Sequence, residues 1–239
     1  MRIGVVIPTR GDRPKLLAHA LYLLARQTVA PDDLVVVDEN MVPPADHVDI
    51  TTRLQVGCQR LLDRGCTHLV WWEDDDWYSP FYLEWMLPRM GQADLFGIGA
   101  TWYYGLVVLG RHLMDHEGRS SGHATMLSAK CARAIEWPKR EPKTWDIELW
   151  QWANRELTLL AQTVPMEDPE RPLVISIKQH HKGRTVVQAH GYRFYYRYND
   201  DLSWLKRALG GDVVSFELYR RIHEENTRNR KPDDERIRA

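Results

Sequence analysis

Three short apolar runs, each followed by a helix-like segment, constrain this chain more than any other feature of it. The runs are Ile3–Pro8, Leu34–Val37 and His68–Trp72, and each is apolar on both faces. A strand with two apolar faces is covered on both sides of its sheet, as the strands of parallel sheets are. The pattern therefore predicts three buried strands in an α/β fold.

The segments after these runs have the spacing of amphipathic helices, over Pro14–Gln27, Ile50–Asp63 and Pro80–Met90. Gly65 follows the second helix at a C-cap position, and Ser79-Pro80 suits the start of the third. Strand–helix–strand repetition implies right-handed crossovers. We therefore expect a mostly parallel central sheet flanked by helices.

Polar residues follow each predicted strand, at Thr9-Arg10, Asp38-Glu39-Asn40 and Glu73–Asp76. Ligands of parallel sheets bind beyond the carboxyl ends of the strands. We therefore expect these three segments to lie together around one ligand site.

The pattern changes after Asp94. Leu95–Leu109, rich in Gly, Tyr and Val, predicts antiparallel strands or a hairpin. Helices are predicted over Ala124–Ile135 and Thr144–Leu160, and a late strand over Val174–Ile177. The second half is therefore expected to form a smaller, antiparallel part.

Size, charge and cysteine content restrict the class of protein. A chain of 239 residues suits one sizeable domain, and a net charge of −1 gives no general attraction to nucleic acid or anionic membranes. Cys58, Cys66 and Cys131 form no CxxC pair, which fits a reducing cytosol. The N-terminus shows no signal-peptide pattern, and no apolar stretch approaches the ~20 residues of a membrane span. We therefore expect a cytoplasmic location.

Four consecutive acidic residues, Glu73–Asp76, end the third strand. Their mutual repulsion would be relieved by a divalent cation, and hard oxygen ligands of this kind suit Mg²⁺ or Mn²⁺. The alternative interpretation is a solvated acidic turn, which the position directly after a buried strand disfavours.

Three segments also carry a family resemblance: IGVVIPTRGDRPKLLAHALYLLARQ, LVVVDEN and HLVWWEDDDWYSPFYLEWM. In this order they resemble the nucleotide-binding half of GT-A-fold glycosyltransferases, especially those of family 2. The resemblance implies a metal-dependent enzyme that moves a sugar from a nucleoside-diphosphate sugar to an acceptor hydroxyl.

The resemblance also implies a domain organisation. A single GT-A-like catalytic domain would span residues 1–225, with a nucleotide-sugar-binding half at 1–92 and an acceptor half at 93–225. Residues 226–239 are expected to form a polar tail.

Carried over by position, the resemblance implies roles at the ends of the first two strands. Pro8, Thr9 and Arg10 would line the nucleotide pocket. Asp38 would accept a hydrogen bond from the base or ribose, with Glu39 as the neighbouring candidate.

At the third strand the resemblance implies that Asp75 ligates the metal directly, with Glu73 and Asp76 as further ligands and Asp74 beside the donor. The first acidic position holds Glu where the family usually has Asp. Glu73 is therefore open to a role at the ribose, at the metal or at neither.

The segment from Thr144 to Trp150 resembles the E-D-x-x-L segment of the family, with Trp145 in place of its Glu. The resemblance implies that Asp146 is the general base of an inverting transfer, with Glu148 as the fallback. The alternative is a first-turn Asp that only complements the helix dipole.

A basic, histidine-rich segment at 178–191 follows the last predicted strand. In the functional interpretation, Lys182 and Arg184 neutralise the diphosphate. A histidine, His181 or His190, completes the metal shell, as a C-terminal histidine does in several GT-A enzymes. The alternative is a solvated basic loop.

Aromatic and basic residues alternate between Tyr192 and Tyr198. Such alternation is typical of a strand with a core face, but it also suits stacking on a nucleotide. On family geometry alone, four residues are candidates for the acceptor side: Trp102, Tyr103, Tyr104 and His123.

Other functions compete with glycosyl transfer to a glycan. The acceptor could instead be a hydroxymethylated DNA base. A sugar-phosphate nucleotidyltransferase is disfavoured because PTRGDRPK contains a single Gly. A non-catalytic carbohydrate- or nucleic-acid-binding module would leave the converging polar strand ends unexplained. Oligomeric state stays open.

Overall fold

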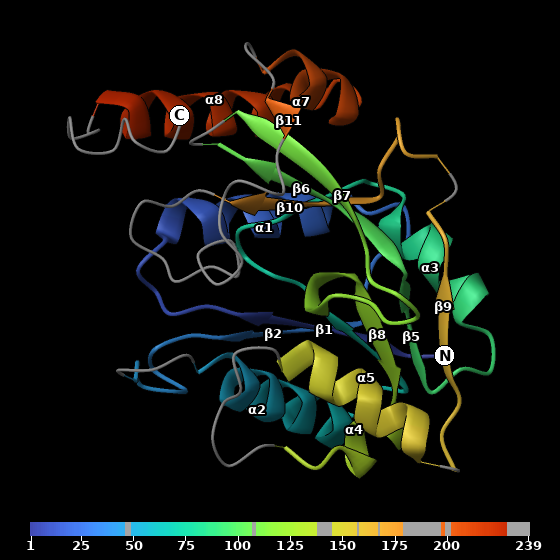
Figure 1. Ribbon diagram of the computed structural model, residues 1–239. Helices are drawn as coiled ribbons and strands as arrows, with labels where there is room; N and C mark the ends of the chain where they lie inside the picture. Colours follow the sequence, from blue (N-terminus) through green and yellow to red (C-terminus); the bar gives the residue numbers. More distant parts are fainter. Residues whose placement is uncertain are drawn as a thin grey trace.

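The computed structural model describes residues 1–45, 49–106, 109–137, 145–156, 158–166, 168–178, 197–198 and 202–228. These residues form two β-sheets with helices packed around them (Figure 1). Among them, no helix has both the length and the apolar composition that crossing a membrane requires.

The larger sheet has six strands in the order β2-β1-β3-β8-β5-β9. The strands are β1 (Ile3–Pro8), β2 (Asp33–Val37), β3 (His68–Trp71), β5 (Leu95–Ile98), β8 (Thr125–Ser128) and β9 (Ala161–Val164). β1 pairs in parallel with β2 and β3, and β5 with β9, whereas β8 runs antiparallel to both its neighbours. The α/β fold with a mostly parallel central sheet is therefore confirmed.

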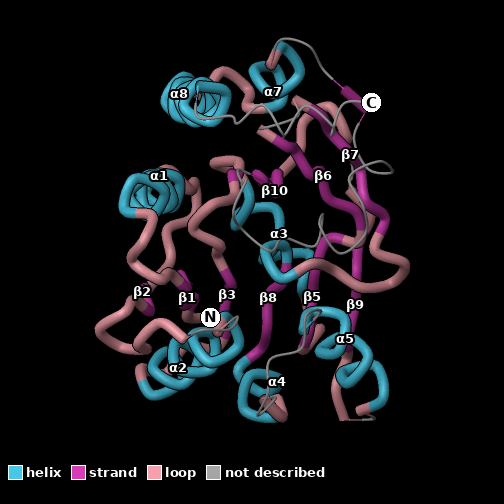
Figure 2. Tube along the Cα trace, turned by 60° about the vertical axis from the view of Figure 1, so that its left-hand side comes forward, coloured by secondary structure: helices cyan, strands magenta, loops and turns pink. Residues whose placement is uncertain are grey.

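Helices cover both faces of this sheet (Figure 2). The helices are α1 (Pro14–Ala25), α2 (Ile50–Asp63), α3 (Tyr82–Met90), α4 (Ala129–Ala134) and α5 (Trp145–Arg155). In β1, Val5 and Ile7 belong to the hydrophobic cluster that includes α1 and α3, while Val6 belongs to the cluster of α2. The alternate residues of one strand thus enter two cores, which is why the strand is apolar on both faces.

The smaller sheet has the order β11-β7-β6-β10-β4. Its strands are β4 (Trp77–Tyr78), β6 (Ala100–Gly105), β7 (Gly110–Asp115), β10 (Val174–Lys178) and β11 (Arg197–Tyr198). Antiparallel strands or a hairpin were expected over Leu95–Leu109. Within that range β6 pairs antiparallel with β7, which begins beyond it at Gly110, whereas β5 belongs to the larger sheet. β10 pairs with β4 antiparallel and with β6 in parallel. Two helices, α7 (Ser203–Ala208) and α8 (Val213–Arg228), complete the fold.

Predicted element bounds were confirmed where local signals are strong. β1 and α2 have the predicted bounds, and α2 ends in a Schellman motif, with Cys66 N–H donating to Leu61 O and Gly65 N–H to Leu62 O. Gly65 takes a positive φ of 80° there. The third helix begins at Tyr82 rather than at Pro80, with Ser79 Oγ accepting from Phe81 N–H ahead of it.

Three predictions about the second half were wrong. The helix expected over Ala124–Ile135 begins only at Ala129, because Thr125–Ser128 pairs as β8 between β3 and β5. Ser128 then caps α4 by accepting a hydrogen bond from Cys131 N–H. The helix expected over Thr144–Leu160 ends at Arg155. Of the residues expected to form a polar tail, 226–228 belong to α8 and 229–239 lie outside the described residues.

Candidate active site: a buried carboxylate–histidine cluster

The acidic segment is a turn that connects the two sheets. β3 ends at Trp71, the acidic residues Glu73–Asp76 follow Trp72, and β4 begins at Trp77. Glu73 N–H donates to Tyr78 Oη at 3.0 Å, and the Trp72 and Tyr78 rings stack with centroids 3.8 Å apart. The aromatic contact folds the turn back on itself, so its four acidic side chains face different surroundings.

Asp76 is fully buried and held by β10. Its Oδ1 accepts hydrogen bonds from Ile177 N–H at 2.8 Å and from Ser176 Oγ at 3.2 Å, and Lys178 Nζ lies 4.0 Å away. Its Oδ2 has no hydrogen-bond partner among the residues that the structure describes. One oxygen of this buried carboxylate is therefore oriented by the protein while the other is left available.

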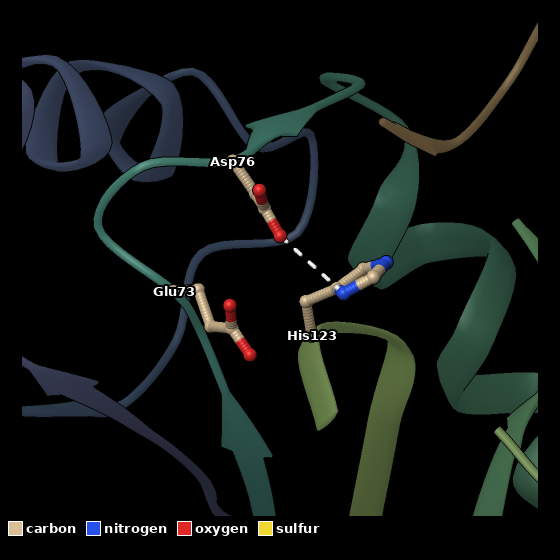
Figure 3. Close-up of side chains that lie close together, drawn as sticks. All are labelled: Glu73, Asp76 and His123. Atoms are coloured by element: carbon tan, nitrogen blue, oxygen red, sulfur yellow. Dashed lines mark ion pairs between the residues drawn. The ribbon is translucent and has the colours of Figure 1, made fainter. Parts of the chain in front are cut away.

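His123 presents a ring nitrogen to that available oxygen. It lies in the 3₁₀ turn η1 (Gly122–Ala124), and its Nδ1 is 3.3 Å from Asp76 Oδ2 (Figure 3). Its Nε2 lies 3.1 Å from Ser121 Oγ. Burial, reinforced by Lys178, lowers the pKa of His123 well below its ordinary value, so the imidazole is neutral.

Glu73 completes a group of three potential ligands. Glu73, Asp76 and His123 each offer one atom, and these atoms lie within 4.8 Å of one another. Burial, and then the Asp76 charge, raise the pKa of Glu73 well above its ordinary value, while burial raises that of Asp76 to about 7. Two carboxylates and a neutral imidazole crowded in this way have the chemistry of a divalent-cation site.

The other two acidic residues of the turn face Arg13, at the start of α1. Arg13 donates to Asp75 Oδ2 at 2.6 Å and to Asp74 Oδ1 at 2.7 Å. Asp75, the ligand favoured by the sequence resemblance, is therefore in an ion pair and outside the group of Glu73, Asp76 and His123. Burial raises the pKa of Asp74 to about 6 against the opposing effect of Arg13. Arg13 is not among the site residues predicted from the sequence, although the segment PTRGDRPK after the first strand contains several basic residues.

The ends of β1 and β2 are joined through Arg53 of α2. This buried guanidinium donates to Thr9 O at 2.6 Å and to Val37 O at 3.2 Å, so the carboxyl edge is held by one side chain. Pro8 ends β1 and pairs with Val37. These contacts fix the backbone on which the predicted nucleotide-binding residues sit.

The predicted nucleotide-binding side chains of this edge contact the start of α2 and the loops that follow β1 and β2. Arg10 Nε donates to Asp49 Oδ1 at 2.9 Å. Asp38 accepts from the backbone N–H groups of Asn40 and Met41, which closes a turn. Glu39 lies against Gly11, where an added Cβ would fall 1.9 Å from Glu39 Oε2.

The structure brings Asp146 to the carboxylate–histidine cluster. Asp146 lies in the first turn of α5, with its Oδ2 3.7 Å from Arg119, and its charge contributes to the raised pKa of Glu73. Burial raises the pKa of Asp146 itself, against the effect of Arg119. The preceding residue, Trp145, packs against Gly122, where an added Cβ would lie 2.7 Å from the indole and 3.3 Å from Glu73 Oε1.

Glu148 lies elsewhere. It is exposed and lines a separate pocket with Trp152 and Arg155. The structure therefore does not bring the fallback base together with Asp146.

The four acceptor-side candidates divide into two pairs. The Tyr103 ring meets that of His123 edge-on at 5.8 Å, so this pair lies at the cluster. Trp102 and Tyr104 instead pack against Trp204 of α7, with ring centroids 5.0 and 5.7 Å away.

Lys178, at the end of β10, is the described cation of the basic segment. Its Nζ lies 5.5 Å from the Tyr103 ring centroid and 4.0 Å from Asp76 Oδ1. Burial opposes its charge, but Asp76, Asp75 and Glu73 together raise its pKa above the ordinary value. The other predicted residues of this segment lie outside the described residues: His181, Lys182, Arg184, His190 and the run from Tyr192 to Tyr196.

No protein-family model and no curated protein matches this chain. Several solved structures are similar to it at low sequence identity. A197 from STIV is 13% identical, with a TM-score of 0.45 over 69% of this chain and 82% of that one. S. aureus TarS 1–349 in complex with UDP-GlcNAc is 12% identical, with a TM-score of 0.48 over 76% of this chain and 60% of that one. A glycosyltransferase involved in the glycosylation of the major capsid of PBCV-1 is 9% identical, with a TM-score of 0.45 over 79% and 96%.

Proposed function

We propose that this chain is a metal-dependent, inverting glycosyltransferase that moves a sugar from a nucleoside-diphosphate sugar to an acceptor hydroxyl. The observation that carries the proposal is the group of half-buried Glu73 and buried Asp76 and His123 at the carboxyl edge of the sheet, with Asp146 beside it. This edge is where sheets of this type bind ligands.

The residues present fit a divalent cation. Asp76 Oδ2 is a buried acceptor without a hydrogen-bond partner among the described residues, and His123 is kept neutral, as a metal ligand must be. Carboxylates suit Mg²⁺ or Mn²⁺, and the added imidazole favours Mn²⁺. Glu73, Asp76 and His123 would hold the ion, which when bound would supply positive charge to the oxygens of a diphosphate.

The surrounding residues would bind and orient the donor. Thr9 and Arg10 follow β1 and Asp38 follows β2, at the edge where a nucleotide would lie. Lys178 adds a second positive charge beside Asp76. Arg13 neutralises Asp74 and Asp75, which lowers the repulsion that the donor phosphates would meet.

Asp146 would act as the general base. In an inverting transfer the acceptor oxygen bonds to the anomeric carbon while the bond from that carbon to the diphosphate oxygen breaks. The hydroxyl proton passes to a carboxylate on the acceptor side. Asp146 is half-buried with a raised pKa, which brings its basicity closer to that useful at neutral pH.

Release of nucleoside diphosphate from a panel of sugar nucleotides, with and without Mn²⁺, tests the proposal without an acceptor. UDP-GlcNAc is a practical first donor. We expect metal-dependent release that Asp76→Asn abolishes and Asp63→Asn, an exposed position on α2, leaves unchanged. Binding of nucleoside diphosphates without turnover would indicate a non-catalytic module. Pyrophosphate release from a nucleoside triphosphate would indicate a nucleotidyltransferase.

A further inference from the structure

A pocket lies beside α5, on the other side of Trp145 from the carboxylate–histidine cluster. It has a volume of 460 Å³ and is bounded by the start of α2, the segment after α4 and one face of α5. The size is within the range of small-molecule sites. On α5 the lining residues Trp145, Glu148, Trp152 and Arg155 recur every three to four positions, so a single helical face forms one wall.

Three tryptophans line this pocket. Trp137, Trp145 and Trp152 are half-buried, so each leaves part of its indole uncovered. Trp71 supports two of them from the core, with ring centroids 5.0 Å from Trp145 and 6.3 Å from Trp137. The indoles are therefore held against a fixed base while apolar faces remain open to the pocket.

Polar side chains surround the indoles. Glu136, Glu148, Gln151 and Arg155 line the same pocket, and all four are exposed. Carboxylates and an amide oxygen accept from hydroxyl groups, and the guanidinium donates to hydroxyl oxygens. The two Glu and one Arg leave a surplus of negative charge, which disfavours phosphate-bearing ligands.

A saccharide has the matching chemistry. Its ring presents apolar C–H groups on a face and hydroxyl groups around the edge, so it can cover an indole and bond to the polar rim. The pocket also adjoins the cluster, because Trp145 lines it and packs against Gly122, next to Glu73 Oε1. Asp146 is the next residue along α5.

We propose that this tryptophan-lined pocket binds an uncharged saccharide, the sugar portion of the acceptor. The role as acceptor site rests on the proposed function, whereas binding of a saccharide does not. The indoles would stack on sugar rings and the rim of Glu148, Gln151 and Arg155 would bond to their hydroxyl groups.

Saturation-transfer-difference NMR on the whole chain, without nucleotide or metal, tests the binding. The probes are N-acetylglucosamine, methyl β-glucoside, cellobiose and chitobiose. We expect saturation transfer to the ring C–H protons of at least one probe. The affinity of Trp152→Ala for that probe should be at least about tenfold lower, because one stacking face is removed. Trp85→Ala is the matched control, because Trp85 is also a half-buried tryptophan on a helix but lies outside the pocket.

The possible outcomes separate this proposal from the proposed function. No transfer to any probe, or equal affinities in Trp152→Ala and the unsubstituted protein, would overturn the saccharide pocket. Displacement of the saccharide by UDP would place it in the donor site and overturn the pocket as well. Saccharide binding through Trp152 in a protein that releases no nucleoside diphosphate would uphold the pocket and reject the glycosyltransferase.

Discussion

Asp76 Oδ2 lies 3.3 Å from His123 Nδ1, and both side chains are buried. The second polar atom of each is held, Asp76 Oδ1 by the β10 backbone and His123 Nε2 by Ser121 Oγ. Contacts of this kind orient the ligands of a metal site. In the proposed function a cation would lie between these two side chains, and Glu73 would be its third protein ligand.

Asp76→Asn should remove cation binding without unfolding the protein. Asn retains an oxygen that can accept from Ile177 N–H, but its amide nitrogen cannot ligate a cation. We expect Mn²⁺ affinity to fall at least about tenfold by calorimetry. The melting temperature without metal should stay the same or rise, because a buried charge is lost. Unchanged Mn²⁺ affinity would contradict the assignment of Asp76.

Mn²⁺ affinity should rise with pH. The pKa of Asp76 is about 7 in the folded chain against an ordinary value of 3.8, so the folded protein holds a proton there that the cation must displace. Because the pKa of Asp76 is raised in the folded state, the free energy of unfolding of the metal-free protein should fall as the pH rises from 3.8 through about 7. Calorimetry from about pH 6 to pH 8, in buffers of different ionisation enthalpy, would count the released protons. A Mn²⁺ affinity that does not change with pH would contradict the displacement of a proton from Asp76.

Asp146→Asn should lower turnover with little effect on donor binding. Loss of a general base costs about 10²–10⁴-fold in rate, whereas Asp146 lies outside the group proposed to hold the cation. Steady-state kinetics should show a fall in kcat at constant KM for the donor.

Arg119→Gln is the companion variant for the role of Asp146. Arg119 opposes the raised pKa of Asp146, so its removal should move the acid limb of the pH–rate profile to higher pH. An unshifted profile would argue for a purely structural Asp146.

Sequence patterns predicted the elements whose signals are local. β1 and α2 have their predicted bounds because an apolar run and an amphipathic repeat with a terminal glycine each specify one structure. β8 was mistaken for the start of a helix, since its strand character comes from pairing with β3 and β5, far away in sequence.

The site was predicted in outline but not in detail. In the sequence, Glu73–Asp76 form one acidic cluster. In the structure, Glu73 and Asp76 lie close to His123, whereas Asp74 and Asp75 form ion pairs with Arg13. Which side chains meet depends on the fold of that turn and on η1, about fifty residues further along the chain. The spacing of residues in the sequence therefore does not predict the contact between the acidic turn and His123.

Arg13→Gln should destabilise the fold in a pH-dependent way. It leaves buried Asp74 and half-buried Asp75 without this partner, which we expect to cost about 2 kcal/mol in the free energy of unfolding near neutral pH. The cost should shrink in acid, where Asp74, with a pKa of about 6, takes up a proton. Urea denaturation at several pH values would measure it, with Arg2→Gln as the control because the Arg2–Asp33 pair is more exposed. Equal losses in the free energy of unfolding for the two variants would show that the Arg13 ion pairs stabilise the fold no more than an exposed ion pair does.

Gly122→Ala should damage the site through a single methyl group. The new Cβ would lie 2.7 Å from the Trp145 indole and 3.3 Å from Glu73 Oε1, so Trp145 must shift and the wall between the cluster and the tryptophan-lined pocket moves with it. We expect a loss of about 1–3 kcal/mol of stability, together with weaker Mn²⁺ binding and weaker saccharide binding in the same variant. Gly99→Ala is the matched control, because the Cβ there would meet its neighbours only at 3.6 Å or more. If Gly122→Ala bound both ligands as the unsubstituted protein does, Trp145 could not be the structural link between the two sites.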